Sequence, residues 1–279
     1  MLQDFMKIKS PLRYPGGKSR AVKKIVPLVP SFNEYREPFI GGGSVFVELK
    51  QLFPNKHYWI NDLNKDLYLF WYFSKTNIKH LVQEITKIKT STINGRALFE
   101  SYKENNVDIT DINRVVRFFV LNRITFSGTV DSGGYSEESF QKRFTSSSIE
   151  RLGNLSTVLS NVKITNLDYQ EVIEKKGDEV FIFLDPPYYS TTKSKLYGKK
   201  GDLHFNFDHK RFSDQMKKCK HKWLITYDDC DEVRNLFDFA NILPWSLQYG
   251  MNNYKKEEIA IGSELFISNY PLPKNFKTQ

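Results

Sequence analysis

The chain has little of what exported, metal-binding or membrane proteins require. Its two cysteines, Cys219 and Cys230, lack metal-ligand spacing and favour a reducing compartment. His204 and His209 have no third ligand at metal spacing, so no metal site is expected. Residues 1–9 contain no apolar core for an export signal, and no segment reaches transmembrane length. These absences predict a cytoplasmic protein that needs no membrane.

Acidic residues are also in deficit. The 279 residues include 41 Lys and Arg but only 32 Asp and Glu, which gives a net charge of +9. Such a balance favours a polyanionic partner, although many basic proteins bind none. The hydrophobic share of 40% and the charged share of 26% are ordinary for a globular protein. The length suits one large domain, or a core with a sizeable insertion.

The strongest signal that is present is an acidic turn after an apolar run. Residues 180–184, Val-Phe-Ile-Phe-Leu, predict a strand buried on both faces of a sheet. Asp-Pro-Pro-Tyr follows at 185–188, and proline cannot continue a strand. Ligands of open α/β sheets bind beyond the carboxyl ends of the strands, so this turn would carry an acid and a ring into a site. The alternative is a Pro-rich turn with a solvated aspartate.

An aromatic amine as substrate would explain these residue types. The lone pair of such an amine is delocalised into its ring, so two hydrogen-bond acceptors are needed to aim it at an electrophile. Asp185 can provide one acceptor and the carbonyl of Pro186 the other. Tyr188 can stack on the base, a contact of about 1–3 kcal/mol. Asp185 need not be a strong base, because the amine becomes acidic once it is alkylated.

A glycine-rich loop forms a second signal. Glu37-Pro-Phe-Ile-Gly-Gly-Gly-Ser44 follows a short strand and precedes an apolar helical stretch, so the chain could turn close to a ligand there. A plain flexible turn is the common alternative. The loop lacks both the third glycine of the dinucleotide fingerprint and the lysine of a phosphate-binding loop. It therefore favours a nucleoside-type ligand without a pyrophosphate.

Two further residues could serve the same ligand. Asp62 ends a second predicted strand, His57–Ile60, about twenty residues after the glycine loop, where a carboxylate commonly accepts hydrogen bonds from ribose hydroxyls. Lys18 follows two glycines and opens a predicted basic helix, Ser19–Val26. It is either a solvated lysine at a helix start or a partner for a ligand carboxylate.

In order, these blocks resemble the Dam-like, D12-class adenine-N6 DNA methyltransferases, which use S-adenosylmethionine. The resemblance is carried by Tyr14-Pro-Gly-Gly-Lys18, by the loop 37–44 and by the turn 185–188, with Asn61-Asp-Leu-Asn64 in support. The glycine loop precedes the turn with a long segment between them, which is the order of the family's α group. In that family, Asp at the first position of the turn is associated with adenine, whereas cytosine-N4 enzymes usually carry Ser.

The resemblance implies roles for individual residues. The catalytic residues would be Asp185, Pro186, Pro187 and Tyr188. The cofactor-binding residues would be Tyr14, Lys18, Glu37, Phe39, Gly41, Gly43, Asp62, Asp168 and Asp185. Lys18 and Tyr14 would contact the amino-acid end of S-adenosylmethionine, and Asp62 would hold its ribose. Asp168 follows the strand-like stretch 162–165 and would bind the cofactor's adenine, although an Asp at a strand end is usually a cap.

The middle of the chain, residues 74–160, has the pattern of a mainly helical insertion. Helices are predicted at 78–89, 95–105 and 111–123, the last capped by Asp111. A glycine-rich, hairpin-like loop follows at 127–136. A helical subdomain with a flexible loop would explain these features, but in the family this position holds the target-recognition region. The DNA-binding candidates are then Arg123, Ser127, Asp131, Tyr135, Lys142 and Arg143.

The rest of the chain completes the expected sheet. A helix is predicted from Asp208 to Lys218, a buried strand at 223–227 and a closing β-hairpin between 258–261 and 264–268.

In the family that the chain resembles, Dam enzymes that read GATC carry an arginine in the recognition loop. Asp131 stands at the nearest position here, so a different recognition sequence is expected.

The sequence thus predicts an α/β, Rossmann-like methyltransferase core with a mixed, mostly parallel sheet. Residues 1–73 and 161–279 would form the core, and 74–160 the inserted target-recognition subdomain. The expected reaction is methyl transfer from S-adenosylmethionine to the N6 amine of an adenine flipped out of duplex DNA. The alternatives are an RNA or protein amide methyltransferase and a catalytically silent DNA-binding regulator. Double-stranded DNA is the expected partner, a cognate restriction endonuclease is a further candidate, and a bacterium or phage would encode the chain.

Overall fold

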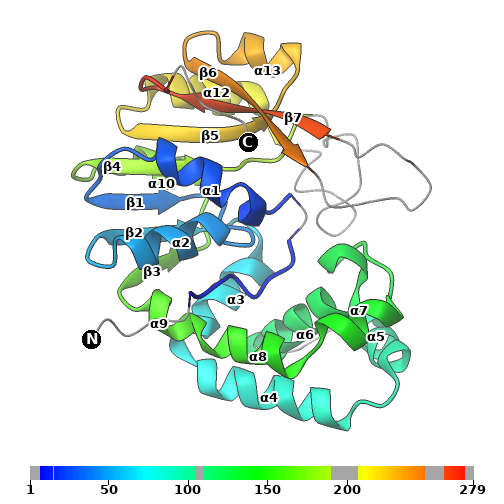
Figure 1. Ribbon diagram of the computed structural model, residues 1–279. Helices are drawn as coiled ribbons and strands as arrows, with labels where there is room; N and C mark the ends of the chain where they lie inside the picture. The colour runs from blue at the N-terminus through cyan, green and yellow to red at the C-terminus, as the bar shows by residue number, and fades with distance from the viewer. Residues whose placement is uncertain (1–6, 15, 105–109, 190–206, 249–260, 274–279) are drawn as a thin grey trace.

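The computed structural model describes residues 7–14, 16–104, 110–189, 207–248 and 261–273, and its centre is one seven-stranded sheet (Figure 1). His204 lies outside the described residues. The strands follow the order β3-β2-β1-β4-β5-β7-β6 across the sheet. Their bounds are β1 Glu34–Glu37, β2 His57–Asn61, β3 Val162–Thr165, β4 Val180–Leu184, β5 Lys222–Asp228, β6 Asn241–Gln248 and β7 Ile261–Ser268.

The sheet is mixed and mostly parallel, as predicted. β1 pairs in parallel with β2 on one side and with β4 on the other. From β1 the chain adds β2 and then β3 toward one edge of the sheet, and it then crosses back to form β4 on the other side of β1. β7 runs antiparallel between β5 and β6. The predicted hairpin 258–261/264–268 is wrong, because Ile261 and Glu264 belong to the same strand. That strand pairs with β5, which the sequence predicts, and with β6, a segment that the apolar pattern did not single out.

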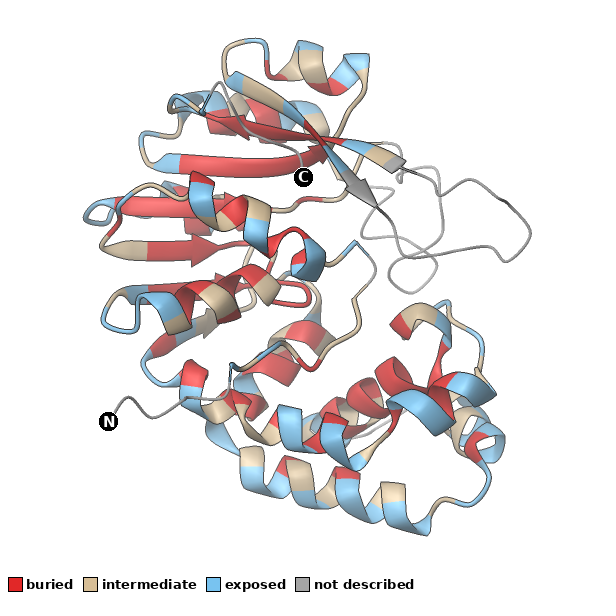
Figure 2. Ribbon diagram, in the orientation of Figure 1, coloured by how far each residue is buried: buried red, intermediate tan, exposed pale blue. Residues whose placement is uncertain are grey.

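Both faces of the sheet are covered, which explains the continuous apolar run of β4. Phe181 and Phe183 point into one hydrophobic cluster, and Ile182 and Leu184 into a second. All five residues of β4 are buried (Figure 2). The first cluster is covered by helices α1 Val22–Ile25, α2 Ser44–Leu52, α3 Lys65–Thr76 and α9 Leu155–Leu159. The second is covered by α10 Tyr169–Glu174, α12 His209–Lys218 and α13 Asp231–Leu236.

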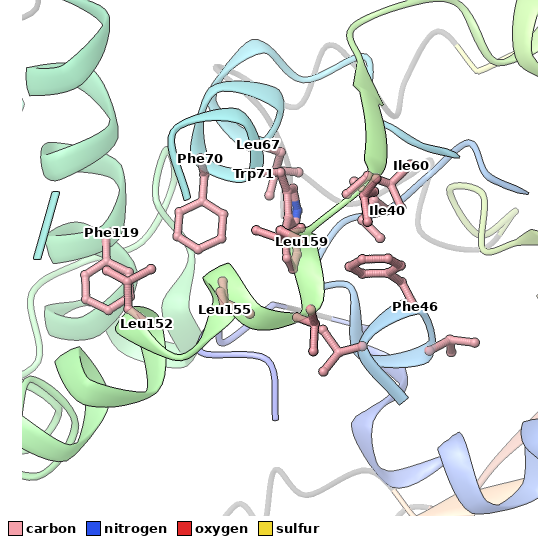
Figure 3. Close-up of a cluster of buried hydrophobic side chains, with 14 of the residues drawn as sticks. Ile40, Phe46, Ile60, Leu67, Phe70, Trp71, Phe119, Leu152, Leu155 and Leu159 are labelled. Atoms are coloured by element: carbon pink, nitrogen blue, oxygen red, sulfur yellow. The ribbon is translucent and has the colours of Figure 1, made fainter. Parts of the chain in front are cut away.

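Five helices between α3 and α9 gather at one end of the molecule (Figure 1). They are α4 Ile78–Ser91, α5 Gly95–Glu104, α6 Asp111–Ile124, α7 Glu137–Arg143 and α8 Ser146–Gly153. They share one hydrophobic cluster with the sheet: the rings of Phe70 in α3 and Phe119 in α6 stack at 6.3 Å (Figure 3). The helical part is therefore anchored to the sheet through a continuous core.

Local details of two helices differ from the expectation. The side chain that caps α6 is Thr110, which accepts a hydrogen bond from the backbone of Asn113, and Asp111 is the first helical residue. The predicted basic helix Ser19–Val26 is broken into the 3₁₀ turn η1 Lys18–Arg20, the single turn α1 and the 3₁₀ turn η2 Val26–Leu28. Pro27 lies within η2 and has no N–H to continue an α-helical ladder. In the described ranges, none of the helices has the length and apolar character to cross a membrane.

Candidate active site

Three carboxylates mark the carboxyl edge of the sheet. Glu37 is the last residue of β1, Asp62 follows β2 and Asp185 follows β4. Because β1 lies between β2 and β4, these three strand ends are neighbours. In open α/β sheets, a ligand crevice forms between two neighbouring strands where the strand order reverses, and β1 and β4 are such a pair. Residues that are far apart in the sequence thus converge on one edge.

Asp185 is held by two side chains from other parts of the chain. The ammonium Nζ of Lys18 lies 2.8 Å from Asp185 Oδ1, and the hydroxyl of Thr226 in β5 donates to the same oxygen at 2.7 Å. Lys18 is only 5% exposed, so it is not a solvated lysine at a helix start. Its Nζ also donates to the carbonyl of Gly16 at 2.8 Å. Both described contacts of Asp185 use Oδ1.

Tyr188 is fixed at its ring and at its hydroxyl. Lys18 Nζ lies 4.8 Å from the ring centroid, which is a cation–π contact. The hydroxyl donates to Glu264 Oε2 in β7 at 2.8 Å. The backbone N–H of Tyr189 donates to Asp228 Oδ1 at 2.9 Å and ties the end of the turn to β5. The turn 185–188 is therefore bound to β5, to β7 and to the N-terminal segment.

The glycine loop owes its shape to packing as well as to backbone freedom. Gly41 and Gly43 have φ of 45° and 65°, which non-glycine residues rarely adopt. A Cβ on Gly41 would come within 3.1 Å of the Tyr14 ring, and one on Gly43 within 2.4 Å of Trp71. The indole N–H of Trp71 donates to the carbonyl of Gly41 at 3.1 Å. The Tyr14 ring thus packs against Gly41, and Trp71 packs against Gly43.

Asp62 holds the glycine loop against the end of β2. Its Oδ2 accepts the N–H of Gly41 and its Oδ1 the N–H of Asn64, both at 2.9 Å. Burial raises the pKa of Asp62 to about 6, against the opposing effect of these two backbone donors. Each carboxylate oxygen retains a lone pair that could accept a hydroxyl.

Glu37 is a buried acid at the end of β1. It is 3% exposed, and Tyr35 donates a hydrogen bond of 2.6 Å to its Oε2. Burial raises the pKa of Glu37 well above its usual value; the Tyr35 hydrogen bond opposes this shift, and the nearby charges of Asp185 and Asp62 add to it. Glu37 is thus close enough to both other carboxylates for their charges to affect its ionisation.

Phe39 and Asp168 lie farther along the edge. The half-buried ring of Phe39 packs on Tyr169 at 5.3 Å and on Phe207 at 5.8 Å. Asp168 is the N-cap of α10, because its Oδ1 accepts the N–H of Gln170 at 2.9 Å. Arg211 pairs with the same oxygen at 3.3 Å. The structure therefore gives Asp168 a structural role, whatever it contacts in addition.

Arg123, the first DNA-binding candidate, is buried in α6. It is 4% exposed, and its Nε and Nη2 have no hydrogen-bond partner among the described residues. Burial, together with the positive charges of Arg13, Arg151 and Arg143, lowers the pKa of Arg123 to about 9. None of the described carboxylates pairs with Arg123, and a buried, unpaired guanidinium beside other positive charges is costly unless an anion binds to it.

The other candidates in the helical part differ in their surroundings. Ser127 has a φ of 54° inside the 3₁₀ turn η3 Phe126–Gly128. The backbone carbonyl of Asp131 accepts from Lys103 Nζ at 2.8 Å. The ring of Tyr135 lies 6.5 Å from Phe140, and its hydroxyl donates to Glu137. Lys142 and Arg143 are exposed, although Lys142 is within 3.1 Å of Glu138. A bridge between Thr125 and Tyr135 closes the loop at its base, which fits the hairpin-like pattern.

Sequence reasoning missed two residues that hold the turn. Thr226 is a polar residue inside the buried strand β5, and Glu264 is a 1%-exposed acid inside β7. A polar side chain in an otherwise apolar strand is a usable signal, because burial requires a partner. The sequence does not say which partner, since Glu264 lies 76 residues from Tyr188.

Comparison with known proteins agrees with this geometry. Residues 14–251 match the family of D12 class N6 adenine-specific DNA methyltransferases. The chain is 28% identical over 225 residues to the type II methyltransferase M.MjaIII of Methanocaldococcus jannaschii, which covers 73% of this chain and 77% of that protein. It is 25% identical to the type II methyltransferase M.CviBI of Paramecium bursaria Chlorella virus NC1A, over 94% of this chain and 100% of the relative. A DNA adenine methylase of Vibrio cholerae is 24% identical over 63% of this chain and 64% of its own.

The matched region includes the glycine loop, the helical insertion and the turn at 185–188. It sets aside the RNA or protein amide methyltransferase and the silent regulator as alternatives. The chain belongs to the D12 class of N6 adenine-specific DNA methyltransferases, and it is an enzyme that methylates adenine in DNA.

Proposed function

We propose that this enzyme transfers a methyl group from S-adenosylmethionine to the N6 amine of an adenine that has been flipped out of duplex DNA. The observation that carries the proposal is the convergence of Asp62, Asp185, Lys18 and Tyr188 at the edge where β1, β2 and β4 end. An adenosyl cofactor and an extruded base both need a crevice with acceptors, a cation and an aromatic face.

The residues around the glycine loop suit S-adenosylmethionine, whose sulfonium group would supply an electrophilic methyl. The lone pairs of Asp62 that remain beside its two backbone bonds could accept the ribose hydroxyls. Lys18 is buried beside this loop and could hold the cofactor's carboxylate. Tyr14, Glu37, Phe39, Gly41 and Gly43 would shape the remaining wall, with Asp168 farther along the edge.

The turn would bind the target base. Lys18 and Thr226 hold Oδ1 of Asp185, so an adenine amine could donate to Oδ2. The carbonyl of Pro186 would accept the second N–H of the amine, and Pro187 would keep the turn rigid. Tyr188 would stack on the base. After transfer the amine carries a positive charge and loses its proton to solvent through Asp185.

Residues 74–160 would form the target-recognition subdomain, and 1–73 with 161–279 the catalytic core. Arg123 supports this assignment, because a guanidinium that has no carboxylate partner among the described residues could pair with a DNA phosphate. Lys142 and Arg143 would hold further phosphates from the surface. Ser127, Asp131 and Tyr135 lie in or beside the loop after α6, which would enter a groove and read the sequence.

A restriction endonuclease of the same specificity is a further proposed partner. Two of the similar proteins are named type II methyltransferases, a class that works beside such enzymes. The proposed site of action is the cytoplasm, on the chromosome of a bacterium or on phage DNA.

Sequencing of modified bases tests the proposal. The chain would be expressed in cells that lack adenine methylation, and we expect N6-methyladenine at one short recurring motif. Purified protein with S-adenosylmethionine labelled in its methyl group should label the same DNA. Unmodified DNA from both experiments, with the protein folded, would reject the proposal.

A further inference from the structure

Glu264 is a buried acid for which the active-site chemistry described so far has no use. It lies in β7, opposite Asp228 of β5 and Trp245 of β6, and is 1% exposed. Because β7 is antiparallel, its early residues lie at the edge where the parallel strands end. A carboxylate is costly to bury unless hydrogen-bond donors compensate it. The position of Glu264 therefore calls for a partner in or beside the active site.

That partner is the tyrosine of the Asp-Pro-Pro-Tyr turn. The Tyr188 hydroxyl donates to Glu264 Oε2 at 2.8 Å. Lys18 Nζ faces the same ring at 4.8 Å, and the Tyr227 ring lies beside it at 6.0 Å with an angle of 31° between the planes. The ring is thus held at its tip by Glu264 and along its body by Lys18 and Tyr227.

We propose that Glu264 is a positioning residue for methyl transfer: it fixes the plane of Tyr188 so that the ring is ready to stack on the target adenine. This inference rests on the proposed stacking role of Tyr188. A stacking platform binds best when its orientation is set before the base arrives, because less freedom is then lost on binding. A hydrogen bond to a carboxylate is about twice as strong as a neutral one, which suits it to this task. Glu264 does not itself touch the base.

The contact also links both catalytic side chains into one unit. Lys18 contacts the carboxylate of Asp185 and the ring of Tyr188, while Glu264 holds the other end of that ring. Movement of Tyr188 would therefore disturb the neighbours of Lys18 and, through them, Asp185. Loss of the Glu264 carboxylate should slow the methyl-transfer step and leave the ribose-binding side of the pocket, around Asp62, intact.

Four variants test the proposal: Glu264→Leu, Glu264→Gln, Tyr188→Phe and the double variant Glu264→Leu/Tyr188→Phe. Leucine removes the acceptor and glutamine keeps an acceptor oxygen, while phenylalanine removes the hydroxyl and keeps the ring. Ser263→Ala is the matched control, because Ser263 is the preceding residue of β7 and donates instead to Asp229 at 2.9 Å. The readouts are the single-turnover transfer rate, calorimetry of S-adenosylmethionine and the fluorescence of 2-aminopurine at the target position, which stacking quenches.

We expect Glu264→Leu and Tyr188→Phe each to slow transfer by about tenfold or more, the effect of losing a hydrogen bond to a charged group. Base fluorescence should rise in both variants, because the base stacks less well, and cofactor affinity should not change. The double variant should be no slower than Glu264→Leu alone, since one contact is removed twice. Glu264→Gln should remain within about threefold of the wild type, because a neutral acceptor retains much of the bond. Ser263→Ala should behave as the wild type.

Three results would overturn the proposal: a wild-type rate and fluorescence in Glu264→Leu, effects of the two single changes that multiply in the double variant, or a Glu264→Gln enzyme as slow as Glu264→Leu. If Glu264→Leu does not fold, Tyr188→Phe removes the same bond from its half-buried side, and a wild-type rate and fluorescence there would reject the proposal. Tyr188→Ala separates the two hypotheses, because full activity in that variant would reject the stacking role on which the inference rests.

Discussion

The edge of the sheet and the helical insertion differ in how they balance charge. At the edge, the buried cation Lys18 is paired with Asp185, and the buried acid Glu264 accepts the Tyr188 hydroxyl. In the insertion, Arg123 is equally buried, but two of its nitrogens lack a partner in the part of the chain that the structure describes, and its charged neighbours are arginines. An internally balanced site can hold its shape without a ligand, whereas an unbalanced one gains from an added anion.

The difference suggests a division of labour. The edge would hold catalytic groups ready in fixed positions, as electrostatic preorganisation requires. The insertion would obtain its missing negative charge from DNA phosphates, so DNA binding there should depend on salt.

Removal of the Asp185 carboxylate should have the largest effect. Asp185→Ala should lower the transfer rate by about a thousandfold or more, within the range for groups that act on a reacting amine. Asp185→Asn should retain a trace of activity, because its amide oxygen still accepts. Single-turnover transfer of a labelled methyl group measures both rates. Turnover of Asp185→Ala near that of the wild type would show that the edge is not the catalytic site.

The loss of Asp62 should act on the cofactor. Asp62→Ala should weaken S-adenosylmethionine binding by about 1–3 kcal/mol, the cost of losing hydrogen bonds from a charged partner. Calorimetry measures the affinity, and circular dichroism checks that the loop tied to Gly41 and Asn64 remains folded. An unchanged affinity in a folded variant would remove Asp62 from the list of ribose ligands.

The pH dependence of cofactor binding should report the same carboxylate. Burial raises the pKa of Asp62 to about 6, and the ionised form is the better acceptor for two hydroxyls. Affinity should be constant above this pKa and fall by up to about tenfold per pH unit below it, because protons then compete with the cofactor. Asp62→Asn cannot titrate and should give a flat profile between pH 5 and pH 8. A profile of the wild type that is equally flat would contradict the proposed contact.

Replacement of Arg123 should separate DNA binding from folding. Arg123→Met should weaken binding to all DNA sequences alike and reduce the salt slope by roughly one unit, the loss of one phosphate contact. The free protein should be no less stable, because burial disfavours the charged form of Arg123 and lowers its pKa to about 9. Titrations at several salt concentrations and thermal unfolding measure the two effects. Lys87→Gln is the control, since Lys87 is exposed and paired with Glu84 at 2.6 Å.

If Arg123→Met is less stable than the wild type and binds DNA with the same salt slope, Arg123 does not contact a DNA phosphate. Arg143→Gln and Lys142→Gln should each weaken binding to all DNA sequences and reduce the salt slope by roughly one unit, the loss of one phosphate contact.

The smallest change in total activity is expected for the loop after α6. Asp131→Ala and Tyr135→Ala should relax or shift the methylated motif, because each base-edge contact contributes about 1–3 kcal/mol of discrimination. The Asp131 carboxylate can accept a hydrogen bond from a cytosine amine, so we expect a G·C pair near the target adenine. Sequencing of modified bases in DNA from cells expressing each variant measures the motif. The same motif in both variants would place specificity elsewhere in the insertion.

Local sequence patterns predicted a helix or strand correctly where the residues of that element alone specify its burial or its turn. The apolar run 180–184 predicted β4, the stretch 162–165 predicted β3, and the helices around 78–89 and 209–218 also formed. The N-cap of α6 was misassigned to Asp111, because adjacent Thr110 and Asp111 can both cap and only the backbone geometry chooses between them. The hairpin at the C-terminus failed for a similar reason: alternation predicts a strand but not its partner.

The sequence by itself determined the family and located the turn 185–188 and the glycine loop, because short motifs in a fixed order are specific to that family. Only the tertiary structure decided that Lys18 and Thr226 share one oxygen of Asp185 and that Glu264 holds Tyr188. It alone also showed that Arg123 is buried with no carboxylate partner among the described residues. These contacts join residues from separate strands and helices. Their distances depend on the order of strands in the sheet, and no local pattern in the chain specifies that order.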